Sequence, residues 1–166
     1  MNILNRFLLK ALNRVKSKHQ SLIYDNYREH YTIHKTFRFN GKDIIFYGKG
    51  QIIIGENTYI GELSTVQADK ECIVRIGKGC KISHNVRMYT STSVADQDFS
   101  KANLENKYSN VIIEDYVWIG ANVFICPGVT IGTNSMIGAN SVVSKDVEPF
   151  TIVGGVPAKL IRKKAH

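Results

Sequence analysis

Residues 113–148 read IEDYVW IGANVF ICPGVT IGTNSM IGANSV VSKDVE, six consecutive units of six residues without a gap. The first place of each unit is isoleucine or valine, and the fifth place is valine or serine. Glycine and asparagine are frequent between the second and fourth places. A period of six matches neither the 3.6-residue period of an α-helix nor the two-residue alternation of a strand. It is typical of a parallel β-helix.

The same phase recurs upstream of this block, so that twelve predicted first places all carry aliphatic residues. Each unit is expected to form one short side of a triangular coil, with its first residue in a narrow core and its small fifth residue near a corner. Glycine and asparagine permit the left-handed backbone that such corners need. A β-sandwich is the alternative, but its strands would not keep one phase over six units. The twelve places are Ile54, Ile60, Val66, Ile76, Ile82, Met88, Ile113, Ile119, Ile125, Ile131, Ile137 and Val143.

Two segments interrupt the repeat. Four extra residues fall between Val66 and Ile76, and residues 94–110 (VADQDFSKANLENKYSN) leave the pattern altogether. A loop of this length within an otherwise regular repeat usually has a function. We expect it to project from the side of the coils.

The two ends of the chain differ from the repeat. Apolar residues at helical spacing predict an amphipathic helix over residues 2–18, and residues 20–50 are expected to be an irregular, aromatic lead-in. A short basic helix is predicted over residues 158–164. The predicted fold class is therefore all-β, a parallel β-helix with a helix at each end. Its predicted parts are the N-terminal helix and lead-in (1–40), the β-helix (41–148) and the C-terminal tail (149–166).

Charge is concentrated at the ends. Lys and Arg number 22 and Asp and Glu 14, a net charge of +8, yet residues 1–20 and 150–166 contain no acid. A nucleic-acid binder would more often have a basic body, so no nucleic acid is expected as a partner. We interpret residues 1–18 either as a cap on the first coil or a contact with a neighbouring subunit, or as a peripheral membrane contact. Solvated terminal charge is the plain alternative.

Length and cysteine usage bound the class of protein. The 166 residues suit one domain, and no stretch approaches the ~20 apolar residues that span a bilayer. The N-terminus lacks the apolar core and cleavage site of a secretory signal. Three cysteines without CxxC spacing and five scattered histidines argue against a disulfide framework or a metal site. These features predict a cytoplasmic protein, with peripheral contact at the inner face of the plasma membrane as the variant that the N-terminal helix allows.

Three segments resemble the hexapeptide-repeat acetyltransferases, and most closely their galactoside, maltose and polysaccharide O-acetyltransferase branch. These segments are VWIGANVFICPGVTIG (117–132), IGANSVVSKDV (137–147) and GGVPAKLIR (154–162). The resemblance implies left-handed coils, whereas general crossover preference favours the other hand. It also implies a homotrimer with active sites between subunits, and acetyl-CoA as co-substrate laid along the coils without a metal.

The resemblance implies a histidine that deprotonates the acceptor, so that the freed nucleophile attacks the thioester. Histidine suits this role because its unperturbed pKa is ~6.5. In galactoside-type enzymes it lies 24 residues before the tryptophan that matches Trp118, and that position here is Val94. His84 lies at the third place of its unit, as the catalytic histidine does in the first acyltransferase of lipid A synthesis and in N-acetyltransferases of nucleotide-linked amino sugars. We take His84 as the base; an exposed turn residue and a loop carboxylate, Asp96 or Asp98, are the alternatives.

Seven residues are assigned to the acetyl-CoA site, and all but Trp118 match family positions that line this co-substrate. Small side chains at 121 and 139 would let the pantetheine arm lie against the coil, and the cations would meet the phosphates. Trp118 would pack beside the acetyl end or cap the coil edge. Cys126 is interpreted as a packed residue, because no base is placed for it. The seven are Trp118, Ala121, Ala139, Ser144, Lys145, Lys159 and Arg162.

The acceptor side is less well defined. Ser64 and Asp69 match sugar-contacting places weakly, and Asn85, Asp96 and Asp98 are further candidates for binding sugar hydroxyls. We predict transfer of acetyl from acetyl-CoA to a sugar hydroxyl in bacterial surface polysaccharide synthesis, such as that of O-antigen or capsule. N-acetylation of a nucleotide-linked amino sugar is the alternative that the place of His84 favours. A non-catalytic β-helix scaffold is the alternative that the missing histidine at Val94 allows.

Overall fold

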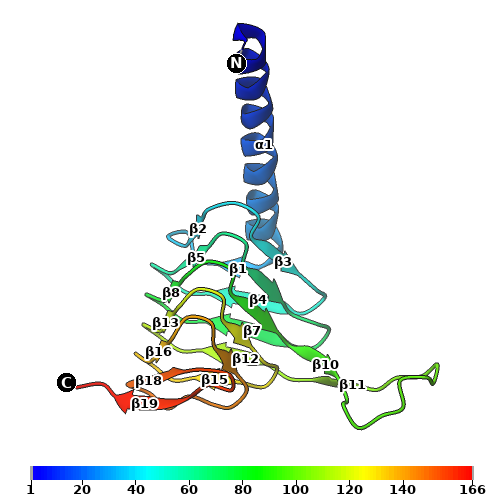
Figure 1. The fold of residues 1–166 in the computed structure, drawn as a ribbon, viewed down its shortest axis with the longest axis vertical. Coiled ribbons are helices and arrows are strands. Elements are labelled where there is room, and N and C mark those ends of the chain that lie inside the picture. Colours follow the sequence, from blue (N-terminus) through cyan, green and yellow to red (C-terminus); the bar gives the residue numbers. More distant parts are fainter. Residues whose placement is uncertain (1, 166) are drawn as a thin grey trace.

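A computed structural model describes residues 2–165 and shows a stack of coils with one long helix at its N-terminal end (Figure 1). Three sheets form the sides of the stack, and each complete coil contributes one strand to each sheet. All their strands are parallel except the terminal strand β19. The first sheet contains β1 (Thr32–Ile33), β4 (Gln51–Ile54), β7 (Ile73–Ile76), β12 (Val111–Ile113) and β15 (Thr130–Ile131).

The second sheet contains β2 (Arg38–Asn40), β5 (Tyr59–Gly61), β8 (Lys81–Ile82), β13 (Trp118–Ile119), β16 (Met136–Ile137), β18 (Thr151–Gly154) and β19 (Lys159–Lys163). The third sheet contains β3 (Ile45–Tyr47), β6 (Thr65–Gln67), β9 (Arg87–Tyr89), β14 (Phe124–Ile125) and β17 (Val142–Val143).

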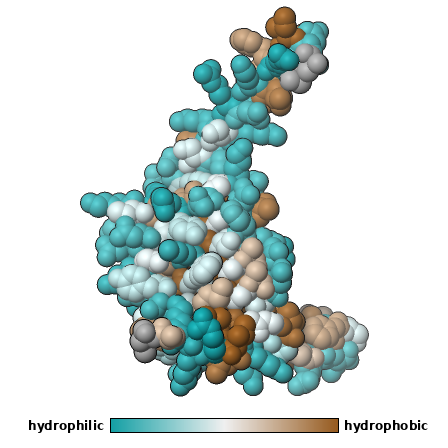
Figure 2. Space-filling model, turned by 60° about the vertical axis from the view of Figure 1, so that its left-hand side comes forward, coloured by the Kyte–Doolittle hydropathy of each residue, from teal (hydrophilic) through white to brown (hydrophobic). Residues whose placement is uncertain are grey.

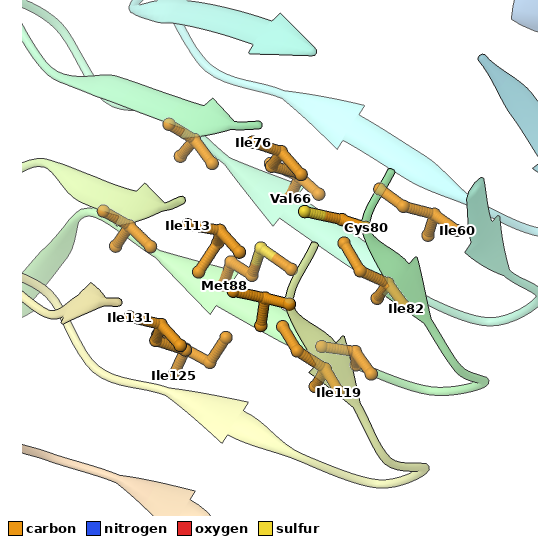
Figure 3. Packing of buried hydrophobic residues seen from close by; sticks show 14 of the residues in the cluster. Ile60, Val66, Ile76, Cys80, Ile82, Met88, Ile113, Ile119, Ile125 and Ile131 are labelled. Carbon is orange, nitrogen blue, oxygen red and sulfur yellow. The ribbon is translucent and has the colours of Figure 1, made fainter. Parts of the chain in front are cut away.

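The core follows the predicted six-residue phase. All twelve first places are buried, with at most 3% of any of these side chains exposed. Residues in the same place of successive coils stack on one another, as Ile60, Ile82 and Ile119 do in the second sheet (Figure 3). Each fully buried aliphatic side chain contributes about 1.5–3 kcal/mol relative to exposure. The prediction of a parallel β-helix is confirmed.

Asparagine serves the corners as predicted. Asn57, Asn85, Asn122, Asn134 and Asn140 all have φ between 53° and 58°. This left-handed conformation is costly for most L-residues, and asparagine is one of the few that adopt it readily. The turn residues therefore let each coil bend without a long loop.

The N-terminal prediction was wrong in extent. Helix α1 runs over Ile3–His30, not 2–18, and the expected irregular lead-in forms a first coil from β1, β2 and β3. Phe39 and Phe46 take the first places of that coil, because they pair with Ile60 and Val66. Aromatic residues and one extra residue between the two places hid the repeat.

The C-terminal prediction of a helix was also wrong. Residues 159–163 form β19, which pairs antiparallel with β18 at the edge of the second sheet. Lys159 to Lys163 are all exposed, so no apolar stripe favours a helix there, whereas the open edge of β18 offers backbone hydrogen bonds. The strands thus extend beyond the predicted 41–148 limits at both ends.

Residues 94–110 leave the coils as predicted. They belong to a hairpin of β10 (Ser91–Ser93) and β11 (Asn106–Tyr108), which projects sideways from the stack (Figure 1). The hairpin starts at the corner between the third and first sheets, because it connects β9 to β12. Among residues 2–165, no helix is long and apolar enough to cross a membrane.

Candidate active site

His84 lies at the corner between the second and third sheets, in the turn from β8 to β9. Its backbone carbonyl accepts a hydrogen bond from the amide of Asn122 at 3.0 Å, and the carbonyl of Ala121 accepts one from the amide of Asn140 at 2.8 Å. These bonds place His84, Ala121 and Ala139 at the same position of three successive coils. We call this set the His84 column. Because adjacent strands lie about 4.8 Å apart, the column spans the length of a short acyl chain.

A ladder of amides runs beside the His84 column. The side-chain amide of Asn85 donates to Asn122 at 3.0 Å, and that of Asn122 donates to Asn140 at 3.0 Å. The ladder fixes the corner, so the column above it has a defined backbone. Asn85, a candidate substrate contact, has one amide hydrogen committed to this ladder.

Side chains in the His84 column are small next to the histidine. Ala121 is half-buried and Ala139 is exposed, so neither fills the space outside the corner. His84 itself is exposed. No large side chain therefore protrudes at Ala121 and Ala139, and the imidazole of His84 is accessible. A flexible chain bearing a thioester can approach the imidazole along this corner.

Trp118 lies on the outer face of the second sheet, three residues before Ala121. It pairs with Lys81 in the coil above and with Met136 in the coil below, and about half of its surface, 52%, is exposed. The indole is therefore available to pack against a ligand.

The predicted phosphate-binding residues gather near the C-terminal end of the stack. Lys145 lines a cavity of about 610 Å³ that is otherwise formed largely by β18, β19 and the chain between β17 and β18. Lys159 and Arg162 lie on β19, and Arg162 pairs with Ile152, which lies two coil positions below Trp118 in the same outward row. Ser144 is exposed directly after β17. All three cations thus lie toward the C-terminal end of the stack, but one chain does not bring them together: Lys145 lies at the corner between the third and first sheets, and Lys159 and Arg162 lie on the second sheet.

The loop carboxylates lie away from the histidine within one chain. The hairpin leaves from one edge of the third sheet, and the His84 column follows the opposite edge. Asp98 accepts hydrogen bonds from the hydroxyl and amide of Ser100, which lower the pKa of its carboxyl group. A lowered pKa makes Asp98 a weaker base. Asp96 is exposed, and Val94 donates its amide to Glu105 in the hairpin.

Two further acceptor candidates have structural contacts. Ser64 is buried, and its hydroxyl donates to Ser83 and accepts from the amide of Val86. Asp69 lies at the hairpin's corner, where its carboxylate accepts from Gln67 and from the amide of Lys70. Ser64 therefore lies buried beneath the His84 turn, with its hydroxyl bonded to backbone groups on both sides of the histidine, whereas Asp69 lies at the opposite edge of the third sheet from His84.

The cysteines are packed. Burial raises the pKa of the Cys80 thiol to about 11 and also raises the pKa of Cys126, so both remain protonated and poorly nucleophilic at neutral pH. Within residues 2–165 no group of three or more His, Cys, Asp or Glu side chains is arranged to hold a metal ion.

The fold and site define a class: a transferase-type β-helix of hexapeptide units. A family model described as bacterial transferase hexapeptide (six repeats) matches residues 110–145. A hexapeptide-repeat acetyltransferase of Vibrio cholerae, solved with acetyl-CoA, superposes with a TM-score of 0.75 at 32% identity, over 93% of this chain and 85% of that one. The chain belongs to the hexapeptide-repeat acetyltransferases, whose β-helix is left-handed.

Curated relatives carry sugar-related names. The galactoside O-acetyltransferase of Escherichia coli K12 is 38% identical over 72% of this chain and 58% of its own length. The polysialic acid O-acetyltransferase of E. coli O1:K1 is 35% identical over 79% of this chain and 42% of its own length. The chain spans about half the length of the curated relatives it matches.

Proposed function

We propose that this protein transfers acetyl from acetyl-CoA to a sugar hydroxyl, with His84 as the general base. The observation that carries the proposal is the His84 column, in which the exposed histidine stands directly above Ala121 and Ala139 at one corner of the stack. Relatives that act on galactosides and on polysialic acid support a sugar acceptor. We further propose that the acceptor belongs to bacterial surface polysaccharide synthesis and that transfer takes place in the cytoplasm; the relative named for polysialic acid favours a polysaccharide acceptor.

The reaction needs few protein groups. The imidazole of His84 removes the hydroxyl proton as the sugar oxygen attacks the thioester carbonyl carbon. The tetrahedral intermediate then collapses, the carbon–sulfur bond breaks, and the coenzyme A thiolate takes up a proton, which the imidazolium can return. Backbone amides at the corner would stabilise the oxyanion. Trp118 would flank the acetyl group, and Lys145, Lys159 and Arg162 would bind the phosphates.

Transfer is tested by release of free thiol from acetyl-CoA over a panel of sugars and nucleotide sugars. Turnover with one hydroxyl acceptor supports the proposal. Turnover confined to nucleotide-linked amino sugars would instead establish the N-acetyltransferase alternative. Failure to bind acetyl-CoA in calorimetry would favour the scaffold alternative.

Removing the donor-site cations should weaken acetyl-CoA binding. The double variant Lys145→Gln, Arg162→Gln is expected to raise the KM for acetyl-CoA at least tenfold, because a charge-assisted hydrogen bond contributes about 1.5–3 kcal/mol. The kcat at saturating donor should change little. Lys101→Gln, a hairpin cation, serves as the matched control. The KM for acetyl-dephospho-CoA is measured as a comparison. An unchanged KM for acetyl-CoA in the double variant would show that Lys145 and Arg162 do not bind its phosphates.

We also propose that the active unit is a homotrimer in which the hairpin of one subunit roofs the His84 column of the next. The separation of hairpin and column within one chain supports this arrangement. Replacing residues 94–105 with Asn-Gly, which suits a two-residue hairpin turn, should abolish activity with the natural acceptor. Mixing these subunits with His84→Ala subunits, after dissociation and reassembly, should restore roughly a quarter of wild-type activity by random pairing. No restoration on mixing would place both elements in one chain's site.

A further inference from the structure

The N-terminal half of α1 presents an apolar stripe that contacts nothing in the described chain. Most of the surface of Leu4 (71%), Phe7 (76%) and Val15 (67%) is exposed, and the helix extends away from the stack along its long axis (Figure 1). Figure 2 shows hydrophobic residues among hydrophilic ones at this tip. The stripe consists of Ile3, Leu4, Phe7, Leu8, Leu12 and Val15; Leu9 is also exposed but lies on the side of Tyr27, about five turns further along the helix.

The stripe faces away from the side by which the helix holds the body. Gln20 accepts from the amide of Asp43, the hydroxyl of Tyr24 donates to the carbonyl of Gly41, and the Tyr27 ring stacks on Phe46. At about 3.6 residues per turn, these docking residues point roughly opposite to the stripe. The stripe therefore does not cap the first coil, so contact with a neighbouring subunit, a membrane contact and solvated charge are the interpretations that stay open.

A row of cations flanks the stripe. Arg6, Lys10, Arg14 and Lys18 follow one another at four-residue spacing. Because each step turns about 40° at 3.6 residues per turn, the row runs obliquely from the docking side at Arg6 to the stripe at Lys18. The first acid in the chain is Asp25. Among residues 2–165 one ion pair occurs, between Lys70 and Glu71, so none of the helix cations pairs with an acid. The first turn also contains no acidic residue to offset the positive end of the helix dipole.

This charge pattern distinguishes two occupants for the stripe. If copies of the helix packed side by side, their unpaired cations would be brought together with no acid to compensate. An anionic lipid surface supplies both the missing charge for the cations and an apolar layer for the stripe. We propose that α1 binds the surface of anionic phospholipid membranes through this stripe, with the cations meeting the headgroups. The side of the helix that docks on the coils then faces away from the lipid.

The test uses the full-length protein and vesicles of phosphatidylcholine with about a third phosphatidylglycerol. Wild type should co-sediment with these vesicles at low salt and bind at least tenfold more weakly to pure phosphatidylcholine. It should be released by 0.5 M salt, because the Debye length is already only about 10 Å at 0.1 M and shortens further as salt is added. Protein that stays in the supernatant with anionic vesicles at low salt would overturn the proposal.

Charge-matched variants separate the stripe from the opposite side of the helix. Leu8→Glu with Val15→Glu places two acids in the stripe, whereas Asn13→Glu with Ser17→Glu places two acids on the polar side. The first pair should weaken vesicle binding at least tenfold more than the second. Equal weakening by the two pairs would show that vesicle binding depends only on net charge, and it would overturn the role of the stripe.

Size measurement and activity complete the experiment. All positions changed are exposed, so thermal melting should be unchanged. If the stripe variant loses subunits by light scattering while wild type ignores vesicles, the stripe is a contact between copies, and the proposal fails. Turnover of a soluble acceptor should be the same in all variants. The membrane proposal and the acetyl-transfer proposal can therefore fail independently of each other.

Discussion

Replacing His84 with alanine should lower kcat about 100-fold or more, the contribution typical of a positioned general base. The loss should appear in kcat and in kcat/KM alike, since the imidazole acts on the hydroxyl proton in the transition state. The measurement is thiol release at saturating acetyl-CoA with the best acceptor of the panel. Calorimetry should show unchanged acetyl-CoA affinity, because the base does not hold the donor's phosphates.

Controls separate catalysis from folding in this experiment. His84 is exposed, so the melting temperature of His84→Ala should equal that of wild type. Glu62→Ala changes the same place of the coil above and should keep its rate within about threefold. Added imidazole should restore part of the lost activity in the alanine variant only. A His84→Ala enzyme that retains the wild-type rate would refute the assignment and direct attention to Asp96, because Asp98 has a lowered pKa.

Gly120→Ala should be the most damaging single-methyl change near the site. A Cβ at this position would lie 2.6 Å from the backbone nitrogen and 2.9 Å from the Cα of Ala139 in the next coil. Backbone atoms cannot swing aside as a side-chain tip can, so the coils must separate where the His84 column stacks. We expect a loss of about 3 kcal/mol in the free energy of unfolding, at the upper end for overpacking. Urea denaturation monitored by Trp118 fluorescence measures it.

Gly138→Ala is the matched control, because both glycines occupy the second place of an IGAN unit. A Cβ at Gly138 would have its nearest neighbour at 3.4 Å, which is ordinary contact. This variant should be neutral or stabilised by about 0.4–1 kcal/mol through the unfolded chain. Equal effects at 120 and 138 would show that coil spacing does not determine the cost.

The part of the fold that was predictable is the part with regular spacing. Wherever the sequence keeps isoleucine, valine or methionine at six-residue intervals, the core is as predicted. The first coil was missed because Phe39 and Phe46 are seven residues apart and aromatic. The helix was predicted too short, although Tyr24, Tyr27 and Tyr31 continue a helical spacing onto the body. The terminal strand depends on pairing with β18, a tertiary preference that overrides local pattern.

The site was predictable only in pieces. His84, Ala121 and Ala139 can each be recognised as the third place of a unit. To predict that they stack, however, one must know how many residues the hairpin takes out of its coil. Ala121 and Ala139 are one regular coil apart, whereas the side chains of Asn85 and Asn122 meet across 37 positions. Ser64 reads as a polar surface candidate, yet the fifth place of a unit points inward. Whether a polar residue faces solvent was therefore decided by its place in the unit.

The two ends of the stack carry a consequence for assembly. A column of parallel coils has unsatisfied strand edges at both ends, and like edges can add further copies without limit. Here aromatic residues of α1 lie over the first coil, and β19 runs against the direction of every other strand in its sheet. A reversed strand cannot continue the parallel register that a second stack would require. The chain therefore carries its own terminators, which favour a particle of fixed length over a growing fibre.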